Sequence, residues 1–188
     1  MTPAVFLDRD GTMIREAGYL ARREELHWFP FTMDAIRLLN RAGFLVFVVT
    51  NQGGIGLGVV DESFVRETHQ WMGETLAAAG ARVDGWLYCR HHPRAVVPEL
   101  RVACHCRKPG RGMIDAALRD HDIDLARSFV VGDKEIDVQL AEAAGMRGIL
   151  VQTGYGDREL ERLQGRVPGA AHVAPNLMAA AAWMIKVS

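Results

Sequence analysis

Short apolar runs rich in β-branched residues recur along the chain, and each predicts a buried strand. Segments with apolar residues at helical spacing lie between these runs, so strands and helices alternate. This alternation predicts an α/β fold, in which helices cover both faces of a doubly wound, mostly parallel sheet. The predicted strands are Ala4 to Leu7, Leu45 to Val49, Trp86 to Tyr88, Phe129 to Val131 and Gly148 to Val151. The predicted helices are Asp34 to Ala42, a long one from Asp61 or Ser63 to Gly80, Ile114 to His121, Glu135 to Ala144 and Leu177 to Ile185.

One stretch, from Cys89 to Gly112, breaks this pattern. It has no sustained periodicity, prolines and glycines interrupt it, and all three cysteines of the chain lie within it. An irregular stretch of this length in a compact domain is typically functional. The predicted helices leave no room for a separate capping domain. We therefore expect a single domain over residues 1–188, with residues 89–112 as a loop insertion.

Length and charge narrow the class of protein. The 188 residues carry 22 Lys+Arg against 23 Asp+Glu, and 49% of them are hydrophobic, as is usual for one globular domain. The near-neutral charge argues against a nucleic-acid partner and is compatible with a monomer. No apolar run approaches the roughly 20 residues of a membrane span, so we expect no membrane partner. An odd number of cysteines and no signal peptide predict a reducing cytoplasm.

Polar side chains follow several predicted strands at their carboxyl ends. Asp8 and Asp10 end the first strand, Thr50 and Asn51 end the second, and Asp133 and Lys134 follow the fourth. Ligands of open α/β sheets bind at this edge. Each signal alone is weak, because an Asp-x-Asp pair often caps a turn and a lone lysine is usually solvated.

The combination is more specific than its parts. Lys108, at the exit of the irregular loop, adds a positive charge to the strand-end carboxylates and hydroxyl. Phosphoryl transfer needs carboxylates for Mg²⁺, an anionic nucleophile, and donors and a cation that neutralise the phosphoryl oxygens. The pattern therefore predicts an enzyme that acts on a small phosphorylated metabolite.

Four ordered motifs resemble those of the haloacid dehalogenase (HAD) superfamily: Asp8 to Thr12, Thr50-Asn51, Lys108, and Gly132-Asp133 with Asp137. The resemblance implies that Asp8 attacks phosphorus to form an aspartyl-phosphate. It implies that Asp10 protonates the leaving group and then activates water. Thr50 and Lys108 would bind the phosphoryl oxygens, and Asn51 would orient the substrate. Mg²⁺ would be held by Asp8, the Asp10 main-chain carbonyl and Asp133, with Lys134 and Asp137 in supporting roles.

The irregular loop carries its own metal-binding pattern. Cys89-x-His91 and Cys104-x-Cys106 offer three thiolates and one imidazole, a set that suits tetrahedral zinc. His92 and His105 remain alternatives for the fourth ligand. Four protein ligands leave no position for water or substrate, so we expect a structural Zn²⁺ site. It would hold the loop so that Arg107 and Lys108 face the phosphate.

The cysteine pairs together with Arg107-Lys108-Pro109 are similar to those of the D-glycero-D-manno-heptose 1,7-bisphosphate phosphatases, which are close to the histidinol-phosphate phosphatases. The resemblance implies removal of the 7-phosphate from a heptose bisphosphate, a step toward the lipopolysaccharide core. Histidinol phosphate or another small metabolite is the alternative substrate. Ile14, Gly53 and Leu57 depart from the residues usual in that group, which bears on the identity of the sugar.

Two other classes of protein remain open. A receiver-like module would accept a phosphoryl group on Asp8, or bind a phosphorylated ligand, as a signal, but it has no need of an acid/base at Asp10. A zinc-stabilised nucleic-acid-binding protein is disfavoured by the neutral charge.

Overall fold

The computed structural model describes residues 1–188 and contains one six-stranded sheet in the order β3-β2-β1-β4-β5-β6. Every pair of neighbouring strands is parallel. The expected α/β fold with a parallel sheet is therefore confirmed. The strands are β1 (Ala4–Leu7), β2 (Leu45–Asn51), β3 (Gly85–Cys89), β4 (Phe129–Gly132), β5 (Arg147–Val151) and β6 (Ala170–Ala174).

Seven α-helices and three short 3-10 helices connect and flank these strands. The α-helices are α1 (Thr32–Arg41), α2 (Gly53–Gly56), α3 (Glu62–Ala78), α4 (Gly112–Asp120), α5 (Glu135–Ala143), α6 (Gly156–Arg162) and α7 (Leu177–Val187). The 3-10 helices are η1 (Arg23–Glu25), η2 (Pro98–Leu100) and η3 (Leu125–Arg127). Only η1 and α1 lie between β1 and β2, so no capping domain is inserted there.

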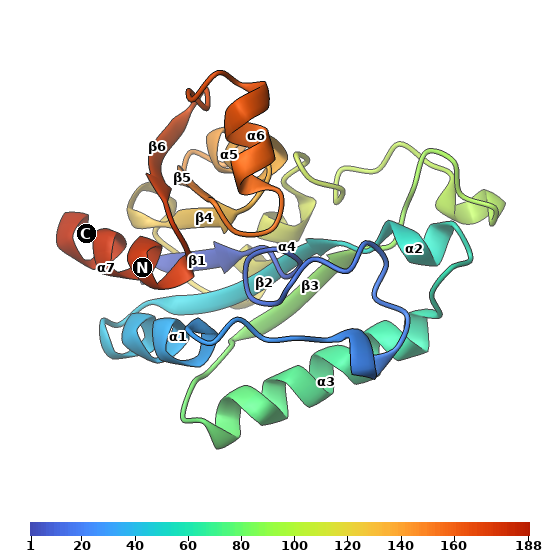
Figure 1. Cartoon of the computed structure of the whole chain (residues 1–188), viewed down its shortest axis with the longest axis horizontal. Helices are drawn as coiled ribbons and strands as arrows, with labels where there is room; N and C mark the ends of the chain where they lie inside the picture. Colours follow the sequence, from blue (N-terminus) through green and yellow to red (C-terminus); the bar gives the residue numbers. More distant parts are fainter.

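The alternation of side chains along β1 explains the two layers of helices. Val5 and Leu7 point to the face on which α1, α3 and α7 pack, whereas Phe6 points to the face covered by α4 and α5 (Figure 1). All three side chains are fully buried. A strand buried on both faces reads as a continuous apolar run, which is why the central strands are visible in the sequence.

Two elements near the C-terminus, β6 and α6, were not predicted from the sequence. The strand Ala170–Ala174 lies at the edge of the sheet and is rich in alanine, so it lacks the β-branched run of the central strands. The helix Gly156–Arg162 is short and mostly charged, with one buried residue, Gly156. Neither element buries enough apolar surface to leave a periodic pattern.

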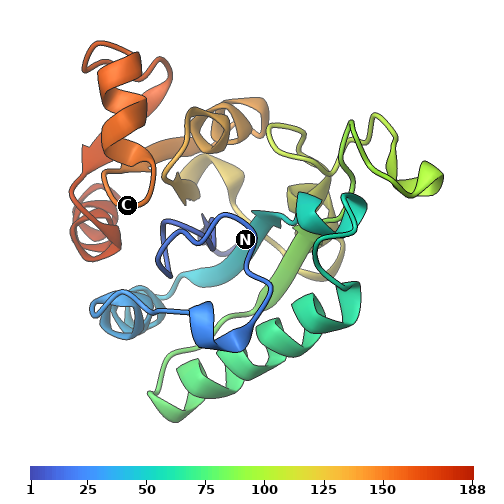
Figure 2. The ribbon, with the colours of Figure 1, turned by 45° about the vertical axis from the view of Figure 1, so that its right-hand side comes forward.

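The strand order places a crevice at the carboxyl ends of β1 and β4. The chain adds β2 and β3 on one side of β1 and then crosses to add β4, β5 and β6 on the other. Ligands of such sheets bind where the order reverses, and Asp8 and Asp133 follow the two strands at this point. Figure 2 turns this edge of the sheet toward the reader.

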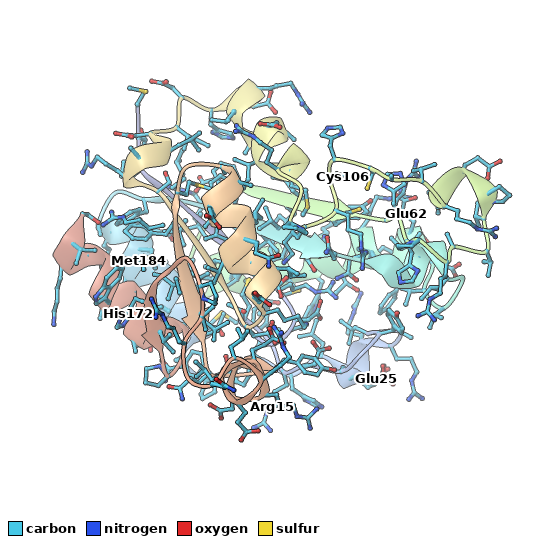
Figure 3. All side chains as sticks on the ribbon, turned by 90° about the horizontal axis from the view of Figure 1, so that it is seen from above. Arg15, Glu25, Glu62, Cys106, His172 and Met184 are labelled. Atoms are coloured by element: carbon cyan, nitrogen blue, oxygen red, sulfur yellow. The ribbon has the colours of Figure 1, made fainter.

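The cysteine loop leaves β3 at the same edge of the sheet. In Figure 3, Cys106 lies toward one end of the molecule and Met184 of α7 toward the other. The loop contains η2 and returns to the body of the protein at α4. No helix of the structure has the length and apolar character needed to cross a membrane.

Phe47 of β2 provides a test of the core. Its ring is 1% exposed and stacks on Phe6, with 5.1 Å between the ring centroids. We expect Phe47→Ala to lower the free energy of unfolding by about 3–5 kcal/mol, because it removes apolar contacts and leaves a cavity. Urea unfolding followed by circular dichroism measures the change. Val59→Ala, at a side chain that is 51% exposed, is the control and should stay within about 0.5 kcal/mol of the parent. A similar small loss for Phe47→Ala would contradict this account of the core.

Candidate active site

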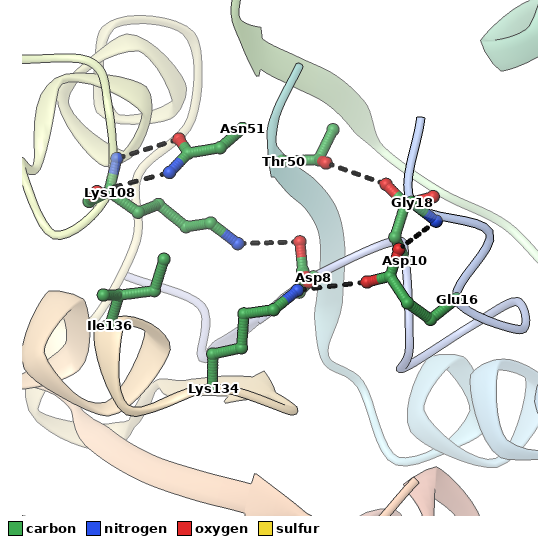
Figure 4. Close-up of a pocket in the computed structure, with 9 residues that line it drawn as sticks. All are labelled: Asp8, Asp10, Glu16, Gly18, Thr50, Asn51, Lys108, Lys134 and Ile136. Atoms are coloured by element: carbon green, nitrogen blue, oxygen red, sulfur yellow. Dashed lines mark hydrogen bonds and ion pairs between the residues drawn. The ribbon is translucent and has the colours of Figure 1, made fainter. Parts of the chain in front are cut away.

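A polar cavity of about 80 Å³ lies at the carboxyl edge of the sheet (Figure 4). One hydrophobic residue contributes to its lining. Its walls come from the loop after β1, the end of β2, the end of the cysteine loop and the start of α5. The nine lining residues are Asp8, Asp10, Glu16, Gly18, Thr50, Asn51, Lys108, Lys134 and Ile136. Six of the positions expected from the sequence therefore share one cavity.

Lys108 is the buried positive charge of this cavity. It is 4% exposed, and its Nζ lies 2.7 Å from Asp8 Oδ1 and 2.6 Å from Asp137 Oδ1. Burial alone would lower the pKa of Lys108, but Asp137 and Asp8 outweigh it and raise the pKa above its ordinary value. Lys108 is therefore a permanent cation beside Asp8, and it is not the solvated surface lysine that the residue type alone would suggest.

Asn51 fixes the main chain of Lys108. Its Nδ2 donates to the Lys108 carbonyl oxygen at 3.2 Å, and its Oδ1 accepts from the Lys108 N–H at 3.0 Å. This reciprocal pair uses both ends of the Asn51 amide. Asn51 therefore positions Lys108, which lies 57 residues further along the sequence.

Several hydrogen-bond donors that do not contact Asp8 surround the carboxylate of Asp10. Its carboxylate accepts from Arg9 Nε and Nη2 at 3.0–3.2 Å and from Gln52 Nε2 at 3.0 Å, while the Thr50 hydroxyl lies 3.5 Å away. Burial would raise the pKa of Asp10, but the Arg9 charge and the hydrogen bonds from Arg9 and Gln52 hold the pKa below its ordinary value. Arg9 is only 1% exposed, so it is a buried charge and not a solvated one.

The pKa values of Asp8 and Asp133 are raised, whereas the pKa of Asp10 is lowered. Burial raises the pKa of Asp8 to about 6, and burial together with the charge of Asp8 raises the pKa of Asp133 to about 8. Asp133 Oδ2 accepts from the Tyr155 N–H at 2.8 Å, whereas its buried Oδ1 has no hydrogen-bond partner. Two buried carboxylates with a free oxygen are the donor set that a hard divalent cation prefers, so these residues fit Mg²⁺.

Asp137 belongs to the same carboxylate cluster, within 4.8 Å of Asp8 and Asp133. Its oxygens are already engaged, one by Lys108 and the other by the Lys134 N–H at 3.2 Å. It thus caps the start of α5 and holds Lys108 in place. This geometry favours a supporting role for Asp137 over direct metal binding.

Lys134 lies across the cavity from Lys108. Its Nζ is 3.1 Å from Glu16 Oε2 and 3.6 Å from Asp133 Oδ1, and it sits over the Tyr155 ring. Glu16 also accepts from the Gly18 N–H at 2.8 Å. Glu16 and Ile136 also line the cavity but were not singled out from the sequence, because no motif spacing marks them.

The three cysteines and His91 form a second cluster. Their four ligand atoms, Cys89 Sγ, His91 Nδ1, Cys104 Sγ and Cys106 Sγ, all lie within 4.8 Å of one another. The Sγ atom of Cys89 is 3.6 Å from that of Cys104 and 3.4 Å from that of Cys106. Thiolates about 2.3 Å from a tetrahedral zinc would lie roughly 3.8 Å apart, so the cluster fits Zn²⁺.

The other two candidate histidines lie outside this cluster. His92 Nδ1 accepts from the Arg94 N–H at 3.1 Å, and the ring of His105 packs against Gly112. Arg107 Nη1 donates to the His91 carbonyl oxygen at 3.0 Å. Arg107 is not among the residues that line the cavity, so here it braces the cysteine loop.

Two of the three departures from the resembling group have a structural reason. Ile14 is fully buried in the core against which α1 and α3 pack, so its side chain does not reach the cavity. A Cβ on Gly53 would lie 2.9 Å from the His92 ring and 3.3 Å from Arg107 Nη1, so a serine would not fit without movement. Leu57 ends α2, and nothing in the structure explains why it replaces arginine.

Comparison with known proteins places the chain among phosphatases. A family model described as HAD-hyrolase-like matches residues 105–180. A D-glycero-beta-D-manno-heptose-1,7-bisphosphate 7-phosphatase of Rhodopseudomonas palustris is 46% identical over 78% of this chain and 81% of the relative. A D-glycero-D-manno-heptose-1,7-bisphosphate 7-phosphatase of Thermosynechococcus vestitus is 42% identical over 97% of this chain and 95% of the relative.

Solved structures agree with these relatives. The D,D-heptose 1,7-bisphosphate phosphatase of B. bronchiseptica, crystallised with magnesium and phosphate, superposes with a TM-score of 0.87 at 33% identity, covering 99% of both chains. The enzyme of the same name from Burkholderia thailandensis gives a TM-score of 0.71 at 31% identity, covering 97% of this chain and 98% of that one. The identity over nearly the whole length shows that the chain belongs to the heptose-1,7-bisphosphate 7-phosphatase family of HAD-like hydrolases.

Proposed function

We propose that the protein is a Mg²⁺-dependent phosphatase that removes the 7-phosphate of D-glycero-D-manno-heptose 1,7-bisphosphate. The observation that carries the chemistry is the pairing of Asp8 with the buried Lys108, 2.7 Å away, in a cavity that Asp10 also lines. The relatives' shared name supports the choice of substrate. A cytoplasmic location and a monomeric state remain predictions from the composition.

The nucleophile is the Asp8 carboxylate. Its oxygen forms a bond to phosphorus while the bond from phosphorus to the sugar oxygen breaks, which leaves an aspartyl-phosphate and the sugar alcohol. Lys108 offsets the negative charge of the phosphoryl oxygens, and the Thr50 hydroxyl offers them a further donor. Asp8, the Asp10 main-chain carbonyl and Asp133 would hold Mg²⁺, whose charge reduces the repulsion between carboxylate and phosphate.

Asp10 moves the proton in both halves of the reaction. It donates a proton to the departing sugar oxygen and then accepts one from the water that attacks phosphorus. The water forms the new bond, the Asp8–phosphorus bond breaks, and inorganic phosphate leaves. The lowered pKa of Asp10 suits the base role. The negative charge of a bound phosphoryl group beside Asp10 favours its protonation and so suits the acid role.

A comparison of substrates tests the proposed function. Phosphate release with Mg²⁺ is measured from both anomers of heptose 1,7-bisphosphate, from histidinol phosphate and from several sugar monophosphates. We expect one heptose anomer to be preferred by about 10² or more in kcat/KM, equivalent to about 2.7 kcal/mol of transition-state binding. Equal, slow release from all of them would show that the physiological substrate is a different one.

Replacing the proposed acid/base separates a phosphatase from a receiver-like module. We expect Asp10→Asn to lower kcat on a sugar phosphate by about 10² to 10⁴, because the amide neither donates a proton to the sugar oxygen nor accepts one from water. Asp122→Asn, at a carboxylate whose side chain is 80% exposed, is the control and should keep full activity. Circular dichroism checks that both variants fold. Unchanged turnover in Asp10→Asn would refute the assigned role.

The cysteine cluster is proposed to hold a structural Zn²⁺. We expect Cys106→Ser to lower both the zinc content and the phosphatase activity, because Lys108 lies two residues from the lost ligand. Inductively coupled plasma mass spectrometry measures bound zinc. His105→Gln, between Cys104 and Cys106 but outside the cluster, should keep its zinc. Full activity in zinc-free protein would show that the loop does not need the metal to place Lys108.

A further inference from the structure

Arg9 lies between the two catalytic aspartates in sequence, but its side chain is outside the cavity that they line. It is 1% exposed, and it is not one of the nine lining residues. Its guanidinium donates hydrogen bonds to three side chains. The acceptors are both carboxylate oxygens of Asp10, Gln52 Oε1 at 3.1 Å and His69 Nε2 at 3.1 Å. Arg9 therefore does not contact a substrate bound in that cavity, although it holds one of the residues that do.

His69 completes this arrangement from helix α3. An arginine N–H can only donate, so His69 Nε2 must accept, and the imidazole is neutral with its proton on Nδ1. Burial and the charge of Arg9 lower the pKa of His69 to about 3, in agreement with a neutral ring. The ring stacks on Trp86 with 5.0 Å between centroids and meets the edge of Tyr88 at 5.6 Å. The imidazole is thus fixed by α3 and β3 together.

This arrangement constrains the orientation of the Asp10 carboxylate. The guanidinium is a rigid planar fork, and an arginine that contacts both carboxylate oxygens fixes the plane of the carboxylate as well as its distance. Gln52 bridges Arg9 and Asp10, because its Oε1 accepts from Arg9 while its Nε2 donates to Asp10 Oδ2. Rotation of Asp10 would leave a buried guanidinium without its partner, which is costly.

We infer that Arg9 and His69 are positioning residues, which hold the Asp10 carboxylate in the orientation needed for proton transfer to the leaving sugar oxygen. This inference rests on the proposed function. Neither residue acts on the substrate itself. His69 fixes Arg9, and Arg9 fixes Asp10, so a residue on α3 controls the acid step from outside the cavity.

A positioning role for Arg9 and His69 can be distinguished from a purely structural one by comparing rates on two substrates. Departure of a sugar alkoxide needs a proton, whereas p-nitrophenolate is a stable anion and leaves without one. Because kcat/KM covers the steps up to departure of the alcohol, misplacement of Asp10 slows the sugar phosphate more than p-nitrophenyl phosphate. General damage to the fold or to Asp8 slows both substrates alike.

The test uses three variants of the full chain on neighbouring positions of α3. His69→Phe keeps an aromatic ring against Trp86 but removes the acceptor for Arg9. His69→Gln retains an acceptor. Thr68→Val, at a side chain that is 1% exposed and whose hydroxyl has no hydrogen-bond partner, is the matched control. For each variant, kcat/KM with Mg²⁺ is measured on heptose 1,7-bisphosphate and on p-nitrophenyl phosphate.

We expect His69→Phe to lower the ratio of the sugar-phosphate kcat/KM to the p-nitrophenyl phosphate kcat/KM by about tenfold or more. His69→Gln should recover part of this loss, and Thr68→Val should leave the ratio unchanged. Equal losses on both substrates, or no loss, would overturn the inference. If His69→Phe does not fold by circular dichroism, Arg9→Lys replaces it with the same expected ratio. A parent protein that releases phosphate from neither substrate would refute the proposed function itself.

Discussion

The buried ion cluster of Lys108 with Asp8 and Asp137 is the interaction on which the rest of the site depends. Three charges with little access to water are tolerated only because each is paired, and loss of one partner from such a cluster typically costs about 3–5 kcal/mol. The surroundings are built to keep this pairing. Asn51 fixes the main chain at Lys108. Gly132 leaves room for Asp137, whose Cγ would lie 2.1 Å from a Cβ at that position.

The two aspartates of the first motif differ because their neighbours differ. Asp8 and Asp10 are two residues apart, yet burial raises the pKa of one while Arg9 and Gln52 outweigh burial and lower the pKa of the other. Carboxylates whose environments push their pKa values apart are typical of sites that divide nucleophilic and proton-transfer work. The loop after β1 thus turns two identical side chains into two distinct chemical groups.

The fold and the strand-end residues could be predicted because both depend on local pattern. Buried parallel strands are continuous apolar runs, and their carboxyl ends meet at one edge, so Asp8, Thr50 and Asp133 were expected to converge. The edge strand β6 leaves no such run. The burial of Arg9 and the contact of Asn51 with Lys108 could not be predicted, because they arise from partners up to 60 residues away in sequence. Only the assembled sheet brings these partners together.

The long sequence separations in the ion cluster have a consequence for synthesis. Asp8 and Lys108 are 100 residues apart, and Asp137 lies 29 residues beyond Lys108. Such distant partners meet only after the intervening loops have closed, which is a late and slow step for a chain. A nascent chain on the ribosome therefore carries Asp8 for most of its elongation without the cation that works beside it. The ion cluster is complete only once the chain as far as Asp137 has folded against β1.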